Sequence, residues 1–121
     1  MNKRILVVED QVDNRRILRD LLASADYEIM EAENGEEALS AAAKQRPDLI
    51  LVDIQLPIMD GYEATRRIKA DPTLTNVPVI AVTSYALSGD KAKARAAGCD
   101  DFVPKPYSPR QLLAKIRQLL R

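Results

Sequence analysis

The sequence contains no histidine, and its single cysteine is Cys99. The missing imidazole removes the commonest general base and the commonest metal ligand of proteins, so chemistry here must use carboxylates, hydroxyls and lysine. One cysteine cannot form an internal disulfide, which is typical of proteins from a reducing compartment. We therefore expect a cytoplasmic protein in which Cys99 serves packing.

An excess of one charge and a long apolar run are also absent. Eighteen Lys and Arg residues balance eighteen Asp and Glu residues, which gives a formal net charge of zero. Nucleic-acid-binding domains usually carry a basic excess, so we expect no direct contact with nucleic acid. No apolar stretch approaches the length of a membrane span, and the N-terminus does not resemble a signal peptide. The length fits one domain, which we place at residues 1–121.

Short apolar runs rich in β-branched residues alternate with segments of helical period. The runs are residues 4–8, 27–32, 48–52, 77–82 and 101–103. In the first helical segment, apolar residues recur at three- and four-residue steps, at Val12, Ile17, Leu18, Leu21 and Leu22. Since each helix carries the chain back to begin another strand, the alternation indicates a parallel sheet. The second run mixes polar and apolar residues, so we place it at an edge of the sheet.

Residues that begin or end helices support these boundaries. They are Asn34 with Glu37 as a capping box, Asp60-Gly61, Ser88, Gly98 as a stop, and Ser108 with Pro109.

Acidic, hydroxyl and basic residues directly follow the predicted strands. Glu9 and Asp10 follow the first run, Asp53 the third, Thr83 the fourth and Lys105 the fifth. Ligands of open parallel sheets bind beyond the carboxyl ends of the strands, where the winding direction reverses. If the first and third strands are neighbours, three carboxylates meet in one shallow pocket, flanked by the hydroxyl and the ammonium group.

Three carboxylates in one pocket repel each other. At ~4 Å and an effective dielectric constant of about 20, each pair costs roughly 4 kcal/mol, so the cluster takes up protons or binds a cation. Hard oxygen ligands without thiol or imidazole favour Mg²⁺ over zinc or copper. A pocket with Mg²⁺, lysine and threonine suits a phosphoryl group, which an aspartate can accept as an acyl phosphate. The pattern therefore predicts Asp53 as a nucleophile beside Mg²⁺.

Four pieces of the chain carry a family resemblance: "VVED", "LILVDIQLPIMDG", "VIAVTSYA" and "DFVPKP". Together they resemble the response-regulator receiver domains of two-component signalling, of the chemotaxis-regulator kind, over essentially the full length. The resemblance implies an α/β, flavodoxin-like three-layer fold, with a five-stranded parallel sheet of order 2-1-3-4-5 and five helices. It also implies a phosphoacceptor signalling domain that is not an enzyme acting on separate substrates.

The resemblance further assigns roles around the acidic pocket. Asp53 accepts a phosphoryl group from a histidine kinase or a histidine phosphotransfer protein. Asp10, Asp53 and the backbone carbonyl of Gln55 hold Mg²⁺, and Glu9 acts through water. Lys105 contacts the phosphoryl group.

The same resemblance implies a conformational switch. The Lys105-Pro106 bond is expected to be cis, and Thr83 and Phe102 match the switch pair of the family. Phosphorylation is expected to change the face built from the fourth helix, fifth strand and fifth helix, which binds a downstream protein. The family varies at the positions of Gln55 and Tyr85, and the residues there influence the lifetime of the phosphoryl group.

Each of these residues also has a structural interpretation. Asp53 can start a turn, Glu9 and Asp10 can cap the first helix, and Phe102 can be a core aromatic residue. The basic residues of the fourth helix are best interpreted as a solvated face, namely Lys91, Lys93 and Arg95.

Three other functions compete. An aspartyl phosphatase of the haloacid-dehalogenase type needs a second Asp where this chain has Gln55. A flavin carrier needs a glycine-rich loop where this chain has "EDQVDN". The third alternative is a receiver-like module that binds partners without phosphorylation. Such a module would not need the complete set of acceptor residues that this chain has, and the complete set therefore argues against it. Both a stand-alone regulator and a receiver from a hybrid kinase or a longer regulator are consistent with the sequence.

Overall fold

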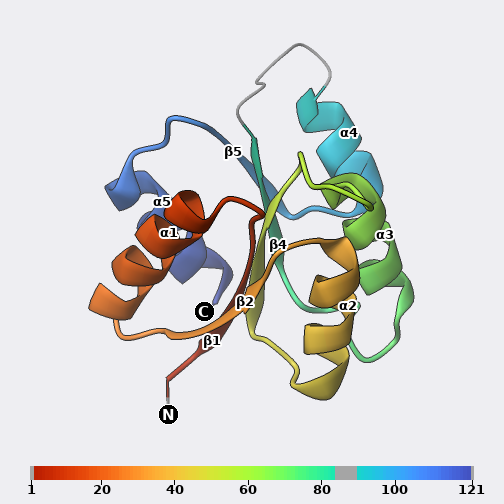
Figure 1. The fold of residues 1–121 in the computed structure, drawn as a ribbon, viewed down its shortest axis with the longest axis horizontal. Helices are drawn as coiled ribbons and strands as arrows, with labels where there is room; N and C mark the ends of the chain where they lie inside the picture. The colour runs from red at the N-terminus through yellow and green to blue at the C-terminus, as the bar shows by residue number, and fades with distance from the viewer. Residues whose placement is uncertain (1, 84–89, 121) are drawn as a thin grey trace.

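The computed structural model of the chain describes residues 2–83 and 90–120. Within these residues, strands and helices alternate along the whole sequence (Figure 1). The elements are β1 (Arg4–Val8), α1 (Val12–Ser24), β2 (Glu28–Ala32), α2 (Gly35–Lys44), β3 (Leu49–Asp53), α3 (Gly61–Ala70), β4 (Val79–Thr83), α4 (Asp90–Ala97), β5 (Asp101–Pro104) and α5 (Pro109–Leu119). Tyr85 and the predicted cap Ser88 lie outside the described residues.

The strands form one parallel sheet in the order β2-β1-β3-β4-β5, which confirms the predicted topology. The edge position of β2 agrees with its mixed sequence, because both of its Glu residues are exposed to solvent. β1 and β3 are neighbours at the centre, with Val8 opposite Val52. The chain therefore reverses its winding direction between β1 and β3, the two strands that must be neighbours for their acidic residues to meet.

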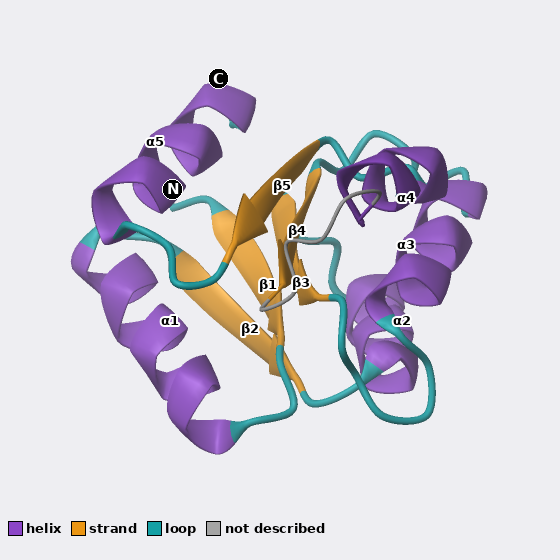
Figure 2. Ribbon diagram, turned by 90° about the horizontal axis from the view of Figure 1, so that it is seen from above, coloured by secondary structure: helices purple, strands orange, loops and turns teal. Residues whose placement is uncertain are grey.

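Helices cover both faces of the sheet, with α1 and α5 on one side and α2, α3 and α4 on the other (Figure 2). Alternate strand residues enter two separate cores, since successive side chains of a strand point to opposite faces. Ile5 and Leu51 pack with Leu22 and Ile116 beneath α1 and α5. The neighbouring residues of β1 and β3 pack instead beneath α2, α3 and α4. Burial on both faces explains why the central strands are apolar throughout.

The structure differs from the sequence prediction at the ends of β3 and β4 and on the apolar face of α1. Asp53 and Thr83 are the last residues of β3 and β4, whereas the sequence placed each of them just beyond its strand. The ladder therefore fixes their backbones. The predicted apolar face of α1 is also only partly buried, because Val12 and Ile17 are 56% and 59% exposed.

Helix ends follow the expected chemistry. Asn34 accepts a hydrogen bond from the Glu37 N–H at 2.9 Å, and Asp60 caps α3 in the same way. The Glu37 carboxylate binds the Glu33 N–H rather than the N–H of the cap residue, so the capping box is shifted by one residue. Gly98 ends α4 at a φ of 107°, a conformation that favours glycine. No helix in the described part of the chain has the length and apolar character needed to cross a membrane.

Candidate functional site

The sheet register brings Glu9 and Asp53 together. Val8 and Val52 are opposite one another, so the next residue of each strand reaches the carboxyl edge at the same level. The Glu9 N–H continues the ladder by donating to the carbonyl of Ala32 on β2 at 3.0 Å. Alternation along the strands directs Glu9 and Asp53 to the side of α1 and α5, where both side chains are at least nine-tenths buried. Two carboxylates therefore share a nearly dry pocket.

Lys105 joins these two acids. Its backbone N–H donates to the carbonyl of Thr83, which places it directly beyond β5. Its Nζ lies 3.0 Å from Glu9 Oε1 and 3.0 Å from Asp53 Oδ2. The bond from Lys105 to Pro106 is cis, as expected from the family resemblance. One ammonium group thus bridges the acid that directly follows β1 and the acid that ends β3.

The electrostatics of the site leave it short of positive charge. Burial, with a smaller contribution from the neighbouring Asp53, raises the pKa of Glu9 from 4.5 to about 7 against the opposing effect of Lys105. Burial alone would lower the pKa of Lys105, but its hydrogen bonds to both acids outweigh burial and raise the pKa. The site therefore favours binding of a proton or a cation.

Asp10 completes a set of oxygen ligands. One carboxylate oxygen each from Glu9, Asp10 and Asp53 lies within 4.8 Å of the others. When all three acids are ionised, three negative charges meet the one positive charge of Lys105, a net charge of −2 that a divalent cation would balance. In the described part of the chain the buried Oε2 of Glu9 has no hydrogen-bond partner. Hard oxygen ligands, incomplete neutralisation and an unsatisfied oxygen all fit Mg²⁺.

The loop between β3 and α3 contacts Asp53 at both of its ends. The Gln55 N–H donates to Asp53 Oδ1 at 2.9 Å, so the second oxygen of this carboxylate is also oriented. Gly61 begins α3 against the strand end, and a Cβ there would overlap the Asp53 carbonyl and lie 2.8 Å from the Ile54 Cα. Only glycine allows this approach. Between them, Ile58 is 78% exposed and has a φ of 70°.

Comparison with known proteins places this arrangement in a family. A profile described as the response regulator receiver domain matches residues 5–117. The chain is a response-regulator receiver domain. It is 42% identical over 120 residues to the polar-differentiation response regulator DivK of Brucella anthropi, covering 99% of this chain and 98% of that protein.

Solved structures agree with this membership. The receiver domain of sensor histidine kinase PA1611 from Pseudomonas aeruginosa is 36% identical, with a TM-score of 0.92 and coverage of 99% and 98% of the two chains. That structure has a magnesium ion coordinated in its active-site cleft. Vibrio cholerae chemotaxis protein CheY4 is 28% identical, with a TM-score of 0.94 and coverage of 99% and 100%. The resemblance to chemotaxis regulators and the flavodoxin-like fold are thereby confirmed.

The two residues of the expected switch pair lie on the other face of this receiver domain. Thr83 is 2% exposed, and alternation along β4 directs it toward the side of α2, α3 and α4. Ala81, two residues earlier, is opposite Phe102 in the β4–β5 ladder. Phe102 is partly buried and packs against the core of that side, so it is not a fully enclosed core aromatic residue. The side chains of the acids and of the switch pair therefore leave the sheet on opposite faces, while Thr83, one residue beyond the Asp53–Val82 pair, stands at the same carboxyl edge as Asp53.

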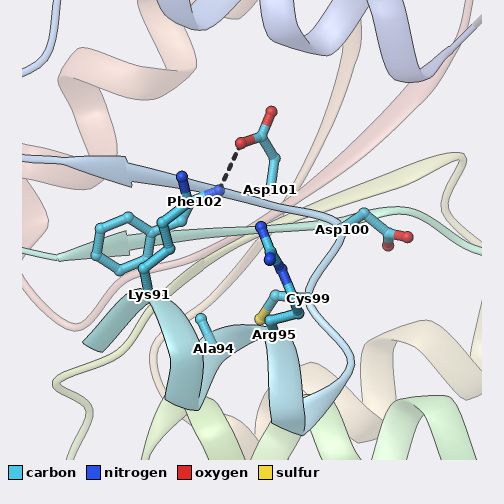
Figure 3. Close-up of a pocket in the computed structure, with 7 residues that line it drawn as sticks. All are labelled: Lys91, Ala94, Arg95, Cys99, Asp100, Asp101 and Phe102. Atoms are coloured by element: carbon cyan, nitrogen blue, oxygen red, sulfur yellow. Dashed lines mark hydrogen bonds between the residues drawn. The ribbon is translucent and has the colours of Figure 1, made fainter. Parts of the chain in front are cut away.

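A polar pocket of about 100 Å³ adjoins Phe102 (Figure 3). It lies between α4 and β5 and is lined by Lys91, Ala94, Arg95, Cys99, Asp100, Asp101 and Phe102. The Phe102 N–H donates to its neighbour Asp101 at 2.8 Å (Figure 3). Cys99 is buried, as expected for a packing role. The basic residues of α4 are exposed, as predicted for a solvated face.

Sequence reasoning missed one side chain at the acidic edge of the receiver domain, Arg15. Its Nη1 donates to the Glu9 carbonyl oxygen at 2.8 Å. A basic residue close to the N-terminus of a helix opposes the helix dipole. A basic residue at this unfavourable position was the one feature of the sequence that could have indicated a role for Arg15. Glu9 and Asp10 do not cap α1, because Gln11 occupies the cap position.

Proposed function

We propose that this receiver domain accepts a phosphoryl group on Asp53 within a two-component phosphorelay. The observation that supports it is the Lys105 ammonium group between Glu9 and Asp53 in a buried acidic cluster. A cluster with a net negative charge and one fixed cation is costly to keep for stability alone. It becomes useful when an anionic group and a divalent cation arrive together.

The proposed transfer is a single displacement at phosphorus. An oxygen of the Asp53 carboxylate forms the P–O bond while the P–N bond to the donor imidazole breaks. The electron pair of that bond stays on the imidazole nitrogen, which takes up a proton. Lys105 holds Asp53 Oδ2 at 3.0 Å and stands beside the charge that the phosphoryl group brings. Membership of the receiver family implies a histidine kinase or a histidine phosphotransfer protein as the donor, and the chain has no histidine that could serve as its own donor.

The residues that would hold Mg²⁺ are Asp10, Asp53 and the carbonyl of Gln55, with Glu9 contributing through water. The bound ion would neutralise charge on the phosphoryl oxygens and on the attacking carboxylate. The Gln55 N–H orients Asp53 from the other side at 2.9 Å. Gln55 also leaves the site without the second Asp of a haloacid-dehalogenase-type phosphatase, which favours a stable acceptor over a hydrolytic enzyme.

We further propose that phosphorylation is transmitted through Thr83 and Phe102. A phosphoryl group adds about −1.5 to −2 charges and strong acceptor oxygens, toward which the Thr83 hydroxyl moves. The space that Thr83 leaves is then taken by the ring of Phe102, and the α4–β5–α5 face changes shape for a downstream protein. Shifting such a switch from 1:99 to 99:1 requires ~5.5 kcal/mol of differential interaction. We place this relay in the cytoplasm and expect no direct contact with nucleic acid.

The direct test is labelling with acetyl phosphate in the presence of Mg²⁺, read by intact-protein mass spectrometry. The parent domain is expected to gain the mass of one phosphoryl group, and Asp53→Asn is expected to gain none while keeping its far-UV circular dichroism. Asp13→Asn is the matched control, because Asp13 is an exposed acid outside the cluster. Equal labelling of Asp53→Asn would refute the acceptor assignment. A parent domain that is never labelled would favour a module that works without phosphorylation.

A further inference from the structure

Arg15 is connected to the metal site through the backbone rather than through a carboxylate. It lies near the start of α1, where its side chain is only 13% exposed. The carbonyl that accepts its 2.8 Å hydrogen bond belongs to the peptide group that joins Glu9 to Asp10. On the other side of Glu9, the backbone N–H is held by the Ala32 carbonyl at 3.0 Å. Both peptide groups that flank Glu9 are therefore fixed, one by the sheet and one by Arg15.

The remaining donors of Arg15 reach two acids at the end of β2. Its Nε lies 3.2 Å from Glu31 Oε1, and its Nη2 lies 3.5 Å from Glu33 Oε1. A planar guanidinium group with three partners in three directions has little rotational freedom, unlike a lysine ammonium group. The edge of the sheet thus anchors the guanidinium group, which in turn anchors the Glu9–Asp10 peptide. The position is costly, because a cation near a helix N-terminus opposes the dipole.

We propose that Arg15 is a positioning residue of the Mg²⁺ site, because its hydrogen bond to the Glu9 carbonyl sets the angle between the Glu9 and Asp10 carboxylates. The two side chains leave the backbone on either side of that peptide group. Rotation of the peptide group would move one carboxylate away from the other two. Mg²⁺ demands near-ideal octahedral geometry, so its affinity depends strongly on such a rotation. This inference rests on the proposed function, which supplies the metal.

The test compares three variants of the unphosphorylated domain by calorimetric titration with MgCl₂. Arg15→Gln removes the guanidinium group, and Arg15→Lys keeps the charge without the three-way geometry. Arg19→Gln is the matched control, because Arg19 lies 3.8 Å from the same Glu31 and has no bond to Glu9. We expect about a tenfold or greater rise in the Mg²⁺ dissociation constant for Arg15→Gln. Arg15→Lys is expected to be intermediate, and Arg19→Gln to stay within about twofold of the parent.

A second measurement separates positioning from a general structural effect. The labelling rate with acetyl phosphate is followed as the Mg²⁺ concentration is raised. Positioning predicts that half-saturation of Arg15→Gln moves to higher Mg²⁺, while the rate at saturating Mg²⁺ stays near that of the parent. A lower saturating rate with unchanged Mg²⁺ dependence would overturn the inference and assign Arg15 a structural role.

The remaining outcomes are also decisive. If Arg15→Gln fails to fold, judged by circular dichroism, Arg15→Lys is used for both measurements. A folded variant whose Mg²⁺ affinity equals that of the parent overturns the inference and leaves the phosphoacceptor function intact. A parent domain that neither binds Mg²⁺ nor becomes labelled overturns the proposed function itself.

Discussion

Glu9 makes the stability of the metal-free domain depend on pH in a calculable way. The side chain is 2% exposed, and burial, together with the neighbouring Asp53 and against Lys105, raises its pKa from 4.5 to about 7. Below pH 4.5 the carboxyl is protonated in both the folded and unfolded states. Between pH 4.5 and 7 only the folded state keeps the proton, so rising pH removes stability. The difference of about 2.5 between the two pKa values corresponds to about 3 kcal/mol.

Glu9→Gln isolates this contribution, because the amide resembles the protonated acid in shape and cannot ionise. Comparing the variant with the parent cancels the titration of the other acids. Since unfolded Glu is already partly ionised at pH 5, the relative stability should change by about 2 to 3 kcal/mol between pH 5 and 8. The variant should be the more stable protein at pH 8, with much less difference at pH 5.

The assay is urea unfolding in the presence of EDTA, followed by far-UV circular dichroism at pH 5, 6, 7 and 8. A difference between parent and variant that is the same at every pH would refute the reasoning about burial. Excess MgCl₂ at pH 8 provides a second readout. It should raise the unfolding free energy of the parent more than that of Glu9→Gln, because ligands that bind only the folded state stabilise it.

Three further substitutions test separate parts of the structure. Lys105→Met removes the cation between the acids and should lower the acetyl phosphate labelling rate by about 100-fold in a folded protein; an unchanged rate contradicts the role of the ammonium group. Ile58→Asn replaces an exposed β-branched residue at a φ of 70° and should raise the free energy of unfolding by about 1 kcal/mol in urea, whereas a loss would show that the turn is unstrained. Lys69 donates to the Val77 carbonyl at 2.7 Å and lies 3.0 Å from Asp100. Lys69→Met should therefore lower the free energy of unfolding in urea by about 2 kcal/mol, and an unchanged free energy would contradict the importance of these contacts.

Much of the fold could be predicted because each strand and helix has a local cause. The runs at 4–8 and 48–52 contain the β-branched and aliphatic residues of buried strands, and β1 and β3 lie where these runs predicted. The caps Asn34 and Asp60 mark the starts of α2 and α3. The side-chain oxygen of each cap accepts a hydrogen bond from a backbone N–H three residues later, so the signal lies within one short stretch of sequence. Exposure of Val12 and Ile17 was not predictable, because spacing alone does not show where the neighbouring helix ends.

The sequence by itself determined which residue types stand at the strand ends, and therefore the oxygen-rich chemistry of the site. The tertiary structure alone decided that Glu9 and Asp53 share one buried pocket, because the pairing of β1 with β3 joins residues far apart in the chain. It also decided that Thr83 lies on the opposite face and that Arg15 reaches the Glu9 carbonyl. Burial, shifted pKa values and backbone anchoring arise from long-range packing, and no local pattern of residues encodes them.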